Sequence, residues 1–235
     1  MFSKSARYYD EIYAAIGKDY AVEAAKMHKI IKMHKQTRGR SLLDIACGTG
    51  GHASYLNKYY QVEGLDLDAD MLAVAKKKYP KMRFYQGDMT NFELGRRFDA
   101  VICLFSSIGY VKTKSRLQKA IKSMARHVLP GGILAVEPWF SAKQWHPGRT
   151  FITQVNKPGL KIVRMSYSGR RGKLSLIEFH YLIGTTKGIE HSIEIHELGL
   201  FTHREYAGAL KAAGLNVIHD PEGLDGRGLY IGQKD

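Results

Sequence analysis

Short apolar runs alternate with helical stretches along the chain between residues 41 and 137. Strands that alternate with helices pair in parallel, because each helix returns the chain to the same end of the sheet by a right-handed crossover. We therefore predict an α/β fold built on a mostly parallel sheet. The predicted strands are residues 41–46, 62–65, 82–85, 100–104 and 132–137, and the helices are residues 21–38, 51–59, 70–78 and 114–128.

The pattern changes after Pro138, where β-type runs separated by turn residues indicate antiparallel strands. These runs are residues 161–167, 174–183 and 189–200. A helix and two strands then return to the α/β pattern, at residues 202–213, 215–219 and 229–233. We predict one domain from residues 1–140 and 201–235, with residues 141–200 as an antiparallel β insertion that covers the ligand pocket or forms a homodimer contact.

The net charge and the two cysteines indicate which partners and which cellular compartment to expect. With 36 Lys and Arg against 22 Asp and Glu, the net charge of +14 indicates anionic partners, either nucleic acid or a nucleotide-linked metabolite, or else a well-solvated basic surface. Cys47 and Cys103 lie in predicted buried segments, so we expect free thiols. Residues 1–13 lack the features of an export signal and no apolar run could span a bilayer, so we expect a cytoplasmic protein without a membrane partner.

The first predicted strand runs directly into a glycine-rich turn. Gly48 and Gly50 allow a sharp bend and let a ligand approach the main chain without a Cβ in the way. Asp44, inside the strand, is expected to hold the loop by accepting amide hydrogen bonds. Any tight turn uses glycine, so this feature gains its meaning from the strands that follow.

Acidic residues also stand at the ends of the next two predicted strands. Asp66 is placed to accept the two hydroxyls of a ribose, and Asp88 to accept the exocyclic amine of an adenine, with Met89 offering its amide and an apolar face. Alternatively, Asp66 caps a helix and Asp88 is a turn residue. Because parallel strands present their carboxyl ends at one edge of the sheet, the combination favours a nucleoside site.

The string Asp-Ile-Ala-Cys-Gly-Thr-Gly at residues 44–50, with Asp66 and the Asp88-Met89 pair, resembles the class I S-adenosylmethionine-dependent methyltransferases. The resemblance implies a Rossmann-like sheet of seven strands whose last strand is antiparallel, S-adenosyl-L-methionine as cofactor and S-adenosyl-L-homocysteine as product. Dehydrogenases generally have a third glycine where this chain has Ala53. The cofactor-binding residues implied by the resemblance further include Tyr9, Tyr20, Ala46, Leu67, Met71, Leu104 and Ser106.

A closer likeness covers nearly the whole chain and is to the N,N-dimethyltransferases of nucleotide-linked deoxyamino sugars in macrolide pathways. The stretches that carry it are residues 17–20, 43–50, 105–109, 136–139, 180–182, 200–202 and 226–228. The resemblance implies a small anionic acceptor, a thymidine diphosphate sugar with a 3-amino or 3-methylamino group, and implies that Tyr9 and Tyr20 close over the cofactor. The chain departs from the family at Tyr110, where a histidine is frequent, and at Phe140, where a second tryptophan is frequent.

Methyl transfer to an amine is an in-line displacement, so the protein must chiefly align the reactants and exclude water. Glu137 or the Tyr110 hydroxyl could orient the amine or take its proton. The alternative for Glu137 is a buried acid that caps the fifth strand through backbone hydrogen bonds.

Other residues are candidates for binding the acceptor. Ser107 lies after the fourth strand, and Trp139 and Phe140 after the fifth could stack on a base or sugar, although core packing is the alternative. Arg170 and Arg227 are candidates for a diphosphate, with Arg227 preferred, against the alternative of solvated surface arginines.

Two other functions and a metal site are alternatives to a small-molecule methyltransferase. An RNA methyltransferase would use the basic surface, but no RNA-binding module or base-methylating tetrapeptide is evident. A cofactor-binding regulatory protein with a degenerate site is the non-enzymatic alternative. His191 and His196 are five residues apart and would face opposite sides of a strand, so we predict no metal site.

Overall fold

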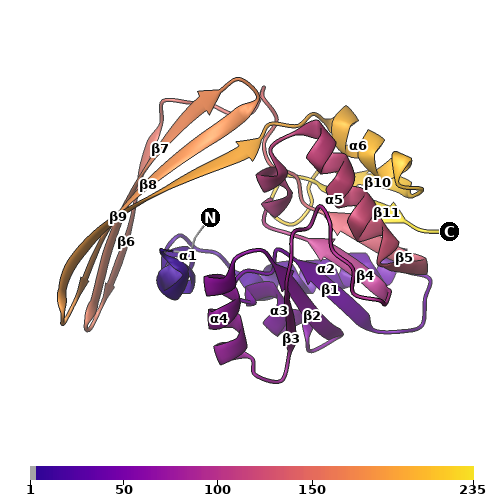
Figure 1. Ribbon diagram of the computed structural model, residues 1–235, viewed down its shortest axis with the longest axis horizontal. Coiled ribbons are helices and arrows are strands. Elements are labelled where there is room, and N and C mark those ends of the chain that lie inside the picture. Colours follow the sequence, from indigo (N-terminus) through magenta and orange to yellow (C-terminus); the bar gives the residue numbers. More distant parts are fainter. Residues whose placement is uncertain (1–3) are drawn as a thin grey trace.

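The computed structural model describes residues 4–235 and contains two sheets (Figure 1). The larger sheet has seven strands in the order β10-β11-β5-β4-β1-β2-β3. Strand β11 runs antiparallel to both of its neighbours, whereas the pairs among β1 to β5 are parallel. The strands are β1 Ser41–Ile45, β2 Gln61–Asp66, β3 Arg83–Gln86, β4 Phe98–Cys103, β5 Val128–Val136, β10 Asn216–Asp220 and β11 Leu229–Gln233. This arrangement confirms the predicted Rossmann-like fold.

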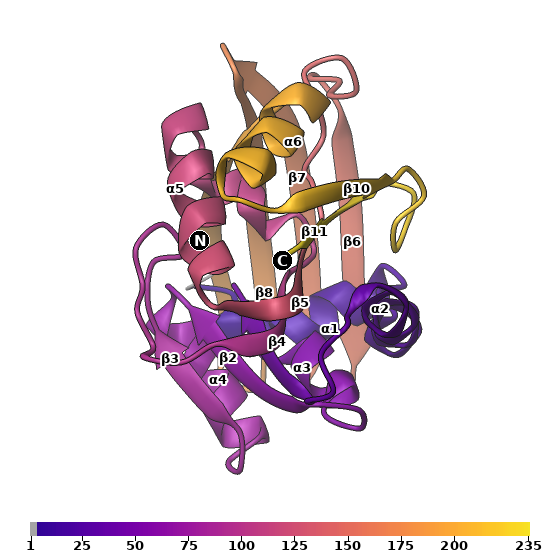
Figure 2. The same cartoon turned by 90° about the vertical axis from the view of Figure 1, so that its right-hand side faces the viewer.

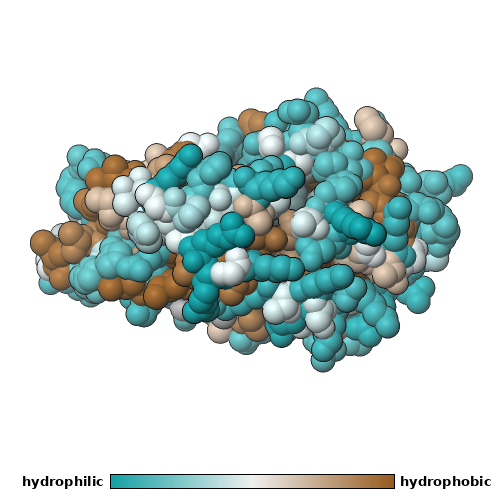
Figure 3. Space-filling model, turned by 90° about the horizontal axis from the view of Figure 1, so that it is seen from above, coloured by the Kyte–Doolittle hydropathy of each residue, from teal (hydrophilic) through white to brown (hydrophobic). Residues whose placement is uncertain are grey.

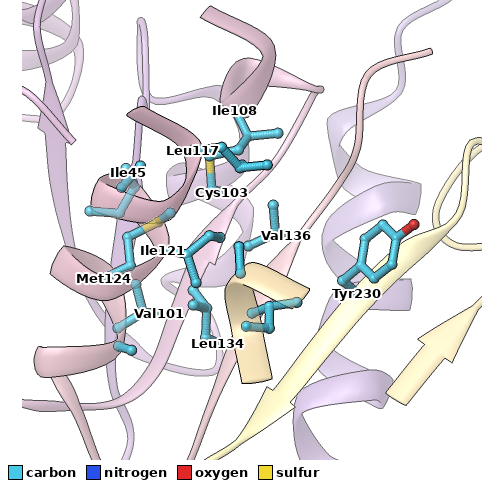
Figure 4. Close-up of a cluster of buried hydrophobic side chains, with 14 of the residues drawn as sticks. Ile45, Val101, Cys103, Ile108, Leu117, Ile121, Met124, Leu134, Val136 and Tyr230 are labelled. Carbon is cyan, nitrogen blue, oxygen red and sulfur yellow. The ribbon is translucent and has the colours of Figure 1, made fainter. Parts of the chain in front are cut away.

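Helices cover both faces of this sheet because alternate strand residues point to opposite sides, as Figure 2 shows. On one face Val101, Leu134 and Val136 pack against α5 and α6, and Figure 4 shows part of this buried cluster. On the other face Ala100 and Ile133 pack against α2 and α3. The helices are α1 Tyr9–Ala15, α2 Tyr20–His34, α3 Gly51–Leu56, α4 Ala69–Lys78, α5 Lys114–Arg126 and α6 His203–Ala212, with 3₁₀ turns η1 Ala6–Tyr8 and η2 Ser107–Val111.

The insertion folds into a four-stranded antiparallel sheet that projects from the main domain (Figure 1). Its strands are β6 Thr150–Lys157, β7 Leu160–Arg171, β8 Leu174–Thr185 and β9 Gly188–Gly199. Alternate residues of these strands are buried on an inner face, where Phe179 and Tyr181 pack with Ile12 of α1. The insertion therefore reaches the main domain through this inner face and the helix α1.

The outer face of the antiparallel sheet exposes large apolar side chains, and hydrophobic patches appear at that end of the molecule in Figure 3. Met165, Tyr167, Leu182 and Ile195 are 46%, 49%, 51% and 60% exposed. A homodimer contact through the insertion stays a prediction. No helix within residues 4–235 is long and apolar enough to cross a membrane.

Several element boundaries differ from the prediction. The strand β6 and the helices before Tyr20 were not predicted; η1 and α1 are short, with 3 and 7 residues. Helix α2 ends at His34, four residues before the predicted end, where the chain turns to donate the Gln36 amide to Gly131. Strand β5 begins at Val128, where we expected the end of a helix, and so includes Pro130. Cys47 and Cys103 are buried free thiols, as predicted.

Candidate cofactor and acceptor site

The turn between β1 and α3 has the backbone conformation that its sequence predicts. Ala46, Gly48 and Gly50 adopt positive φ angles of 57°, 55° and 80°, a region that favours glycine. The Asp66 carboxylate at the end of β2 holds this turn, because its Oδ2 accepts the Gly48 amide at 2.7 Å and its Oδ1 accepts the Asp68 amide at 2.8 Å. Each oxygen keeps a further lone pair for a ligand hydroxyl.

Asp44, at the inner end of β1, does not fill the role that we expected of it. Its Oδ2 is buried and accepts no hydrogen bond from residues 4–235, so Asp66 and not Asp44 holds the loop amide. Burial, and then the nearby Asp66 charge, raise the pKa of Asp44 to about 8. The residue borders a small cavity that Tyr20, Gly48 and Leu104 also line. A buried carboxyl without a partner at a cavity favours a ligand that brings a donor or a positive charge.

A second cavity joins the ends of β2 and β3 and continues from the first. It is lined by Tyr9, Ala46, Gly48, Asp66, Leu67, Met71, Asp88, Met89, Ser107, Tyr110, Val111 and Arg116, among others. The structure thus brings the three strand ends predicted to hold a nucleoside to one cavity. Asp88 Oδ1 accepts the Thr90 amide at 2.8 Å, and its Oδ2 lies 2.9 Å from Arg116 Nη2. Arg116 on α5 was not predicted, because only the fold brings it beside Asp88.

The N-terminal helices cover these cavities. Tyr9 of α1 borders both of them, and Tyr20, the first residue of α2, borders the smaller one. A Cβ on Gly51 would lie 2.8 Å from the Tyr20 ring, so the ring needs a glycine at this position. The Thr49 hydroxyl donates to Asp10 at 2.6 Å, which fastens α1 to the glycine-rich turn.

The ends of β4 and β5 meet around Glu137. This carboxyl is 1% exposed and its Oε2 accepts the Phe105 amide at 2.7 Å, while its Oε1 lies 3.0 Å from Arg227 Nη2. Burial raises its pKa to about 7, although Arg227 opposes the rise. Phe105 and Ser106 have positive φ angles of 52° and 57°, and the Ser106 hydroxyl donates to the Pro138 carbonyl at 2.7 Å. These contacts fix the loop after β4 next to the cavities.

Three observations decide to which family the chain belongs. A family model described as a methyltransferase domain matches residues 42–132. The chain is 44% identical to dTDP-3-amino-3,6-dideoxy-alpha-D-glucopyranose N,N-dimethyltransferase of Streptomyces fradiae, over 97% of this chain and 89% of the relative. It is 40% identical to dTDP-3-amino-3,4,6-trideoxy-alpha-D-glucopyranose N,N-dimethyltransferase of Streptomyces venezuelae, over 95% of both. The chain belongs to this family of methyltransferases.

Solved structures agree with this assignment over the full fold. The crystal structure of DesVI from Streptomyces venezuelae matches with a TM-score of 0.91 at 39% identity, over 97% of both chains. The structure of CalS10 from Micromonospora echinaspora, described as an amino pentose methyltransferase with bound S-adenosylmethionine, matches with a TM-score of 0.87 at 34% identity. The methyltransferase is therefore dependent on S-adenosylmethionine, as the glycine-rich turn indicated.

The residues of the methyltransferase fit this cofactor. Gly48 borders both cavities without a side chain, and the unpartnered Asp44 carboxyl is complementary to the ammonium group of a methionine moiety. Gly50 borders neither cavity and faces the Tyr79 ring. Asp66 and Asp88 present acceptors at the opposite end, between the apolar side chains of Leu67 and Met89. Leu104 borders the smaller cavity, whereas Ser106 is buried and lines neither cavity. The individual cofactor contacts stay predictions.

Tyr110 reaches both the larger cavity and the insertion. Its hydroxyl lies 2.7 Å from His196 Nδ1, and His196 Nε2 lies 3.6 Å from Glu194 Oε2. Glu194 in turn accepts hydrogen bonds from the hydroxyls of Ser5 and Tyr181. His196 was weighed only as a metal ligand in the sequence. It is 1% exposed, and no group of three or more metal-ligating side chains occurs in residues 4–235.

The remaining acceptor candidates lie in different surroundings. Trp139, Phe140 and Trp145 form one aromatic cluster, and the Trp139 indole donates to Ser175 Oγ at 2.8 Å. Arg170 is exposed, donates to the Gly172 carbonyl, and borders a groove that contains none of the cofactor residues. Arg227 contacts Glu137, Asp225 and, at 3.1 Å, the Ser106 hydroxyl, so two carboxylates neutralise it.

Proposed function

We propose that the methyltransferase acts on the amine of a deoxyamino sugar linked to thymidine diphosphate. The observation that carries this proposal is that Ser107 and Tyr110 border the same cavity as Gly48 and Asp66. An acceptor held by residues after β4 and β5 would thus adjoin the cofactor. The substrates named for relatives that are 44% and 40% identical over nearly the whole chain support the choice of sugar.

S-adenosylmethionine supplies an electrophilic methyl group on a sulfonium, and the protein has to present a neutral amine in line with it. The Tyr110 hydroxyl is the group in this cavity that is best placed to accept a hydrogen bond from the amine. As the amine is methylated it gains a positive charge, and it returns to neutral by losing one proton. Tyr110 can take that proton while passing its own to His196 Nδ1, which can accept it because burial lowers the pKa of the imidazole and so keeps the ring neutral beforehand.

In this proposal the main role of Glu137 is to hold neighbouring residues in position. Its two oxygens contact the Phe105 amide and the Arg227 guanidinium, so it shapes the loop that carries Ser106 and Ser107. Trp139 and Phe140 form an apolar wall beside this loop that suits the unsubstituted face of a deoxy sugar. We therefore treat Glu137 as a positioning residue and Tyr110 as the catalytic one.

Methyl transfer from labelled cofactor tests this proposal. The acceptor panel contains dTDP-3-amino-3,6-dideoxyglucose, the corresponding free amino sugar, glycine, sarcosine and tRNA. We expect transfer to the nucleotide-linked sugar, with mass spectrometry counting the methyl groups added. Transfer to tRNA alone, with binding that weakens steeply as salt is raised, would instead assign the basic surface to nucleic acid.

A further inference from the structure

The inner face of the antiparallel sheet buries one arginine that the proposed reaction does not use. Arg164 lies in the middle of β7 and is 6% exposed. Its guanidinium carbon lies 4.7 Å from the centre of the Phe179 ring and 5.3 Å from that of Tyr13. Burial raises the pKa of the Tyr13 hydroxyl and Arg164 opposes that rise, which places the cation beside this hydroxyl.

The hydrogen-bonding capacity of Arg164 is mostly unused. Its Nη2 donates to Thr153 Oγ1 at 3.2 Å, but its Nε and Nη1 are buried and find no acceptor among residues 4–235. A guanidinium stays charged at any physiological pH, and burying it without a counter-charge is costly. Arg227, the other buried arginine near the site, contacts two carboxylates. Arg164, in contrast, forms no ion pair with a carboxylate of residues 4–235.

Arg164 borders a groove of about 360 Å³ on the inner face of the insertion. The groove combines aromatic side chains with hydroxyl groups, from Trp145, Phe151, Thr153, Ser166, Ser168 and Phe179 among others. Such a lining suits a ligand that has both a ring and an anionic group. A carboxylate-rich lining would instead have indicated a cation.

The groove and the cofactor cavity are connected by a short series of packed side chains. The Phe179 ring packs edge-on against His196, with 5.1 Å between the ring centres, and His196 contacts the Tyr110 hydroxyl. Arg164 is thus separated from the Tyr110 hydroxyl by two side chains. An anion on Arg164 would lie at the far end of a sugar whose amine faces Tyr110.

We propose that Arg164 binds the diphosphate of the acceptor nucleotide, with its unused Nε and Nη1 donating to phosphate oxygens. Two parallel donors of a guanidinium match two oxygens of a phosphate, which a lysine cannot reproduce. The inference rests on the proposed function, because it takes the acceptor to be nucleotide-linked. It moves the diphosphate from Arg227, which we preferred from the sequence, to a residue on the insertion.

Binding of dTDP alone, measured by calorimetry in the presence of S-adenosylhomocysteine, tests the assignment. We expect Arg164→Gln to weaken dTDP binding about 10- to 100-fold and Arg164→Lys to weaken it less. Arg171→Gln is the matched control, because Arg171 is an exposed arginine of the same strand. Unchanged dTDP affinity in Arg164→Gln, or no dTDP binding by the wild-type protein, would overturn the proposal.

Thermal unfolding separates a binding role from a structural one. Arg164→Met removes a buried charge that lacks a partner, so we expect an unchanged or higher Tm without ligand and no rise in Tm on adding dTDP. A lower Tm together with a normal response to dTDP would show that Arg164 only supports the sheet.

The amine assay then distinguishes the two proposals. If the wild-type protein methylates the nucleotide-linked sugar and Arg164→Gln leaves KM unchanged, the diphosphate assignment fails and the proposed function stands. If dTDP binds through Arg164 but no amino sugar is methylated, the proposed function fails and the diphosphate assignment stands.

Discussion

The Tyr110 hydroxyl lies 2.7 Å from His196 Nδ1 and so links the cofactor-binding domain to the insertion. Tyr110 belongs to the turn after β4, whereas His196 belongs to β9 of the antiparallel sheet. His196 is buried and Tyr110 half-buried, and both lie near Glu194. The insertion therefore contacts a residue that borders the larger cavity.

This contact predicts that the two residues act as a unit. Tyr110→Phe should lower kcat by about 100-fold, because the phenyl ring can neither accept nor pass on a proton. His196→Gln should lower kcat by about tenfold, since Tyr110 keeps its contact with the amine. The double variant should be no slower than Tyr110→Phe alone. Steady-state kinetics check this, and multiplicative losses would show that the two side chains act independently.

Cofactor affinity should be unchanged in these variants, which calorimetry with S-adenosylhomocysteine checks. A pH profile supplies a second readout, because removal of His196 should shift the acidic limb of kcat if its imidazole accepts the proton. An unchanged profile in His196→Gln would leave His196 as a packing residue.

Asp66→Ala should weaken S-adenosylmethionine binding by about 10- to 100-fold, because it removes an acceptor from the ribose and frees the Gly48 amide that shapes the turn. Glu190→Ala, at an exposed position of the insertion, is the control for the loss of one acidic side chain. Near-normal affinity in calorimetry would refute the ribose assignment.

Cofactor binding should release a proton from Asp44. Its pKa of about 8 in the ligand-free protein keeps it neutral at lower pH, whereas a cofactor ammonium group favours the carboxylate. Affinity should therefore rise with pH, by up to about tenfold per unit, and level off above about pH 8. Calorimetry in buffers of different ionisation enthalpy counts the proton, and Asp44→Asn should abolish the dependence.

The same raised pKa has the opposite consequence for stability without cofactor. The pKa of Asp44 is higher in the folded protein than in the unfolded chain, so the protonated carboxyl favours the folded state. Its contribution to the free energy of unfolding is complete below about pH 4 and is lost as the pH rises through about 8. Urea titrations of wild type and Asp44→Asn across this window measure the difference. A wild-type contribution that increases with pH would contradict the burial of Asp44.

Gly51→Ala should weaken cofactor binding by displacing the Tyr20 ring, which lies 2.8 Å from the position of the added Cβ. Gly208→Ala is the matched control, because Gly208 is an exposed residue of α6 with no atom within 4 Å of an added Cβ. The control should stabilise the protein by about 0.5–1 kcal/mol and leave binding unchanged. Equal cofactor affinities in the two variants would show that the Tyr20 ring adapts.

The sequence was sufficient to predict the main sheet and to bring the expected cofactor residues to one edge of it. Gly48, Asp66 and Asp88 lie at or just after the ends of three successive strands, and parallel pairing brings successive strand ends to one edge. Their spacing along the chain therefore determines their proximity in space. The caps of α4 and α6, at Asp68 and Thr202, depend only on neighbours within three residues.

The acceptor end depended on contacts between distant segments. Tyr110 meets His196 across 86 residues, and Arg227 meets Ser106 across 121. Whether a strand residue such as Arg164 faces solvent or the interior depends on which surface its sheet covers, and local periodicity does not specify that. The amino-acid sequence by itself therefore determined the fold class and which strand ends border one cavity. The packing of the insertion on α1 decided which side chains surround Arg164 and His196, because these contacts join segments far apart in the chain.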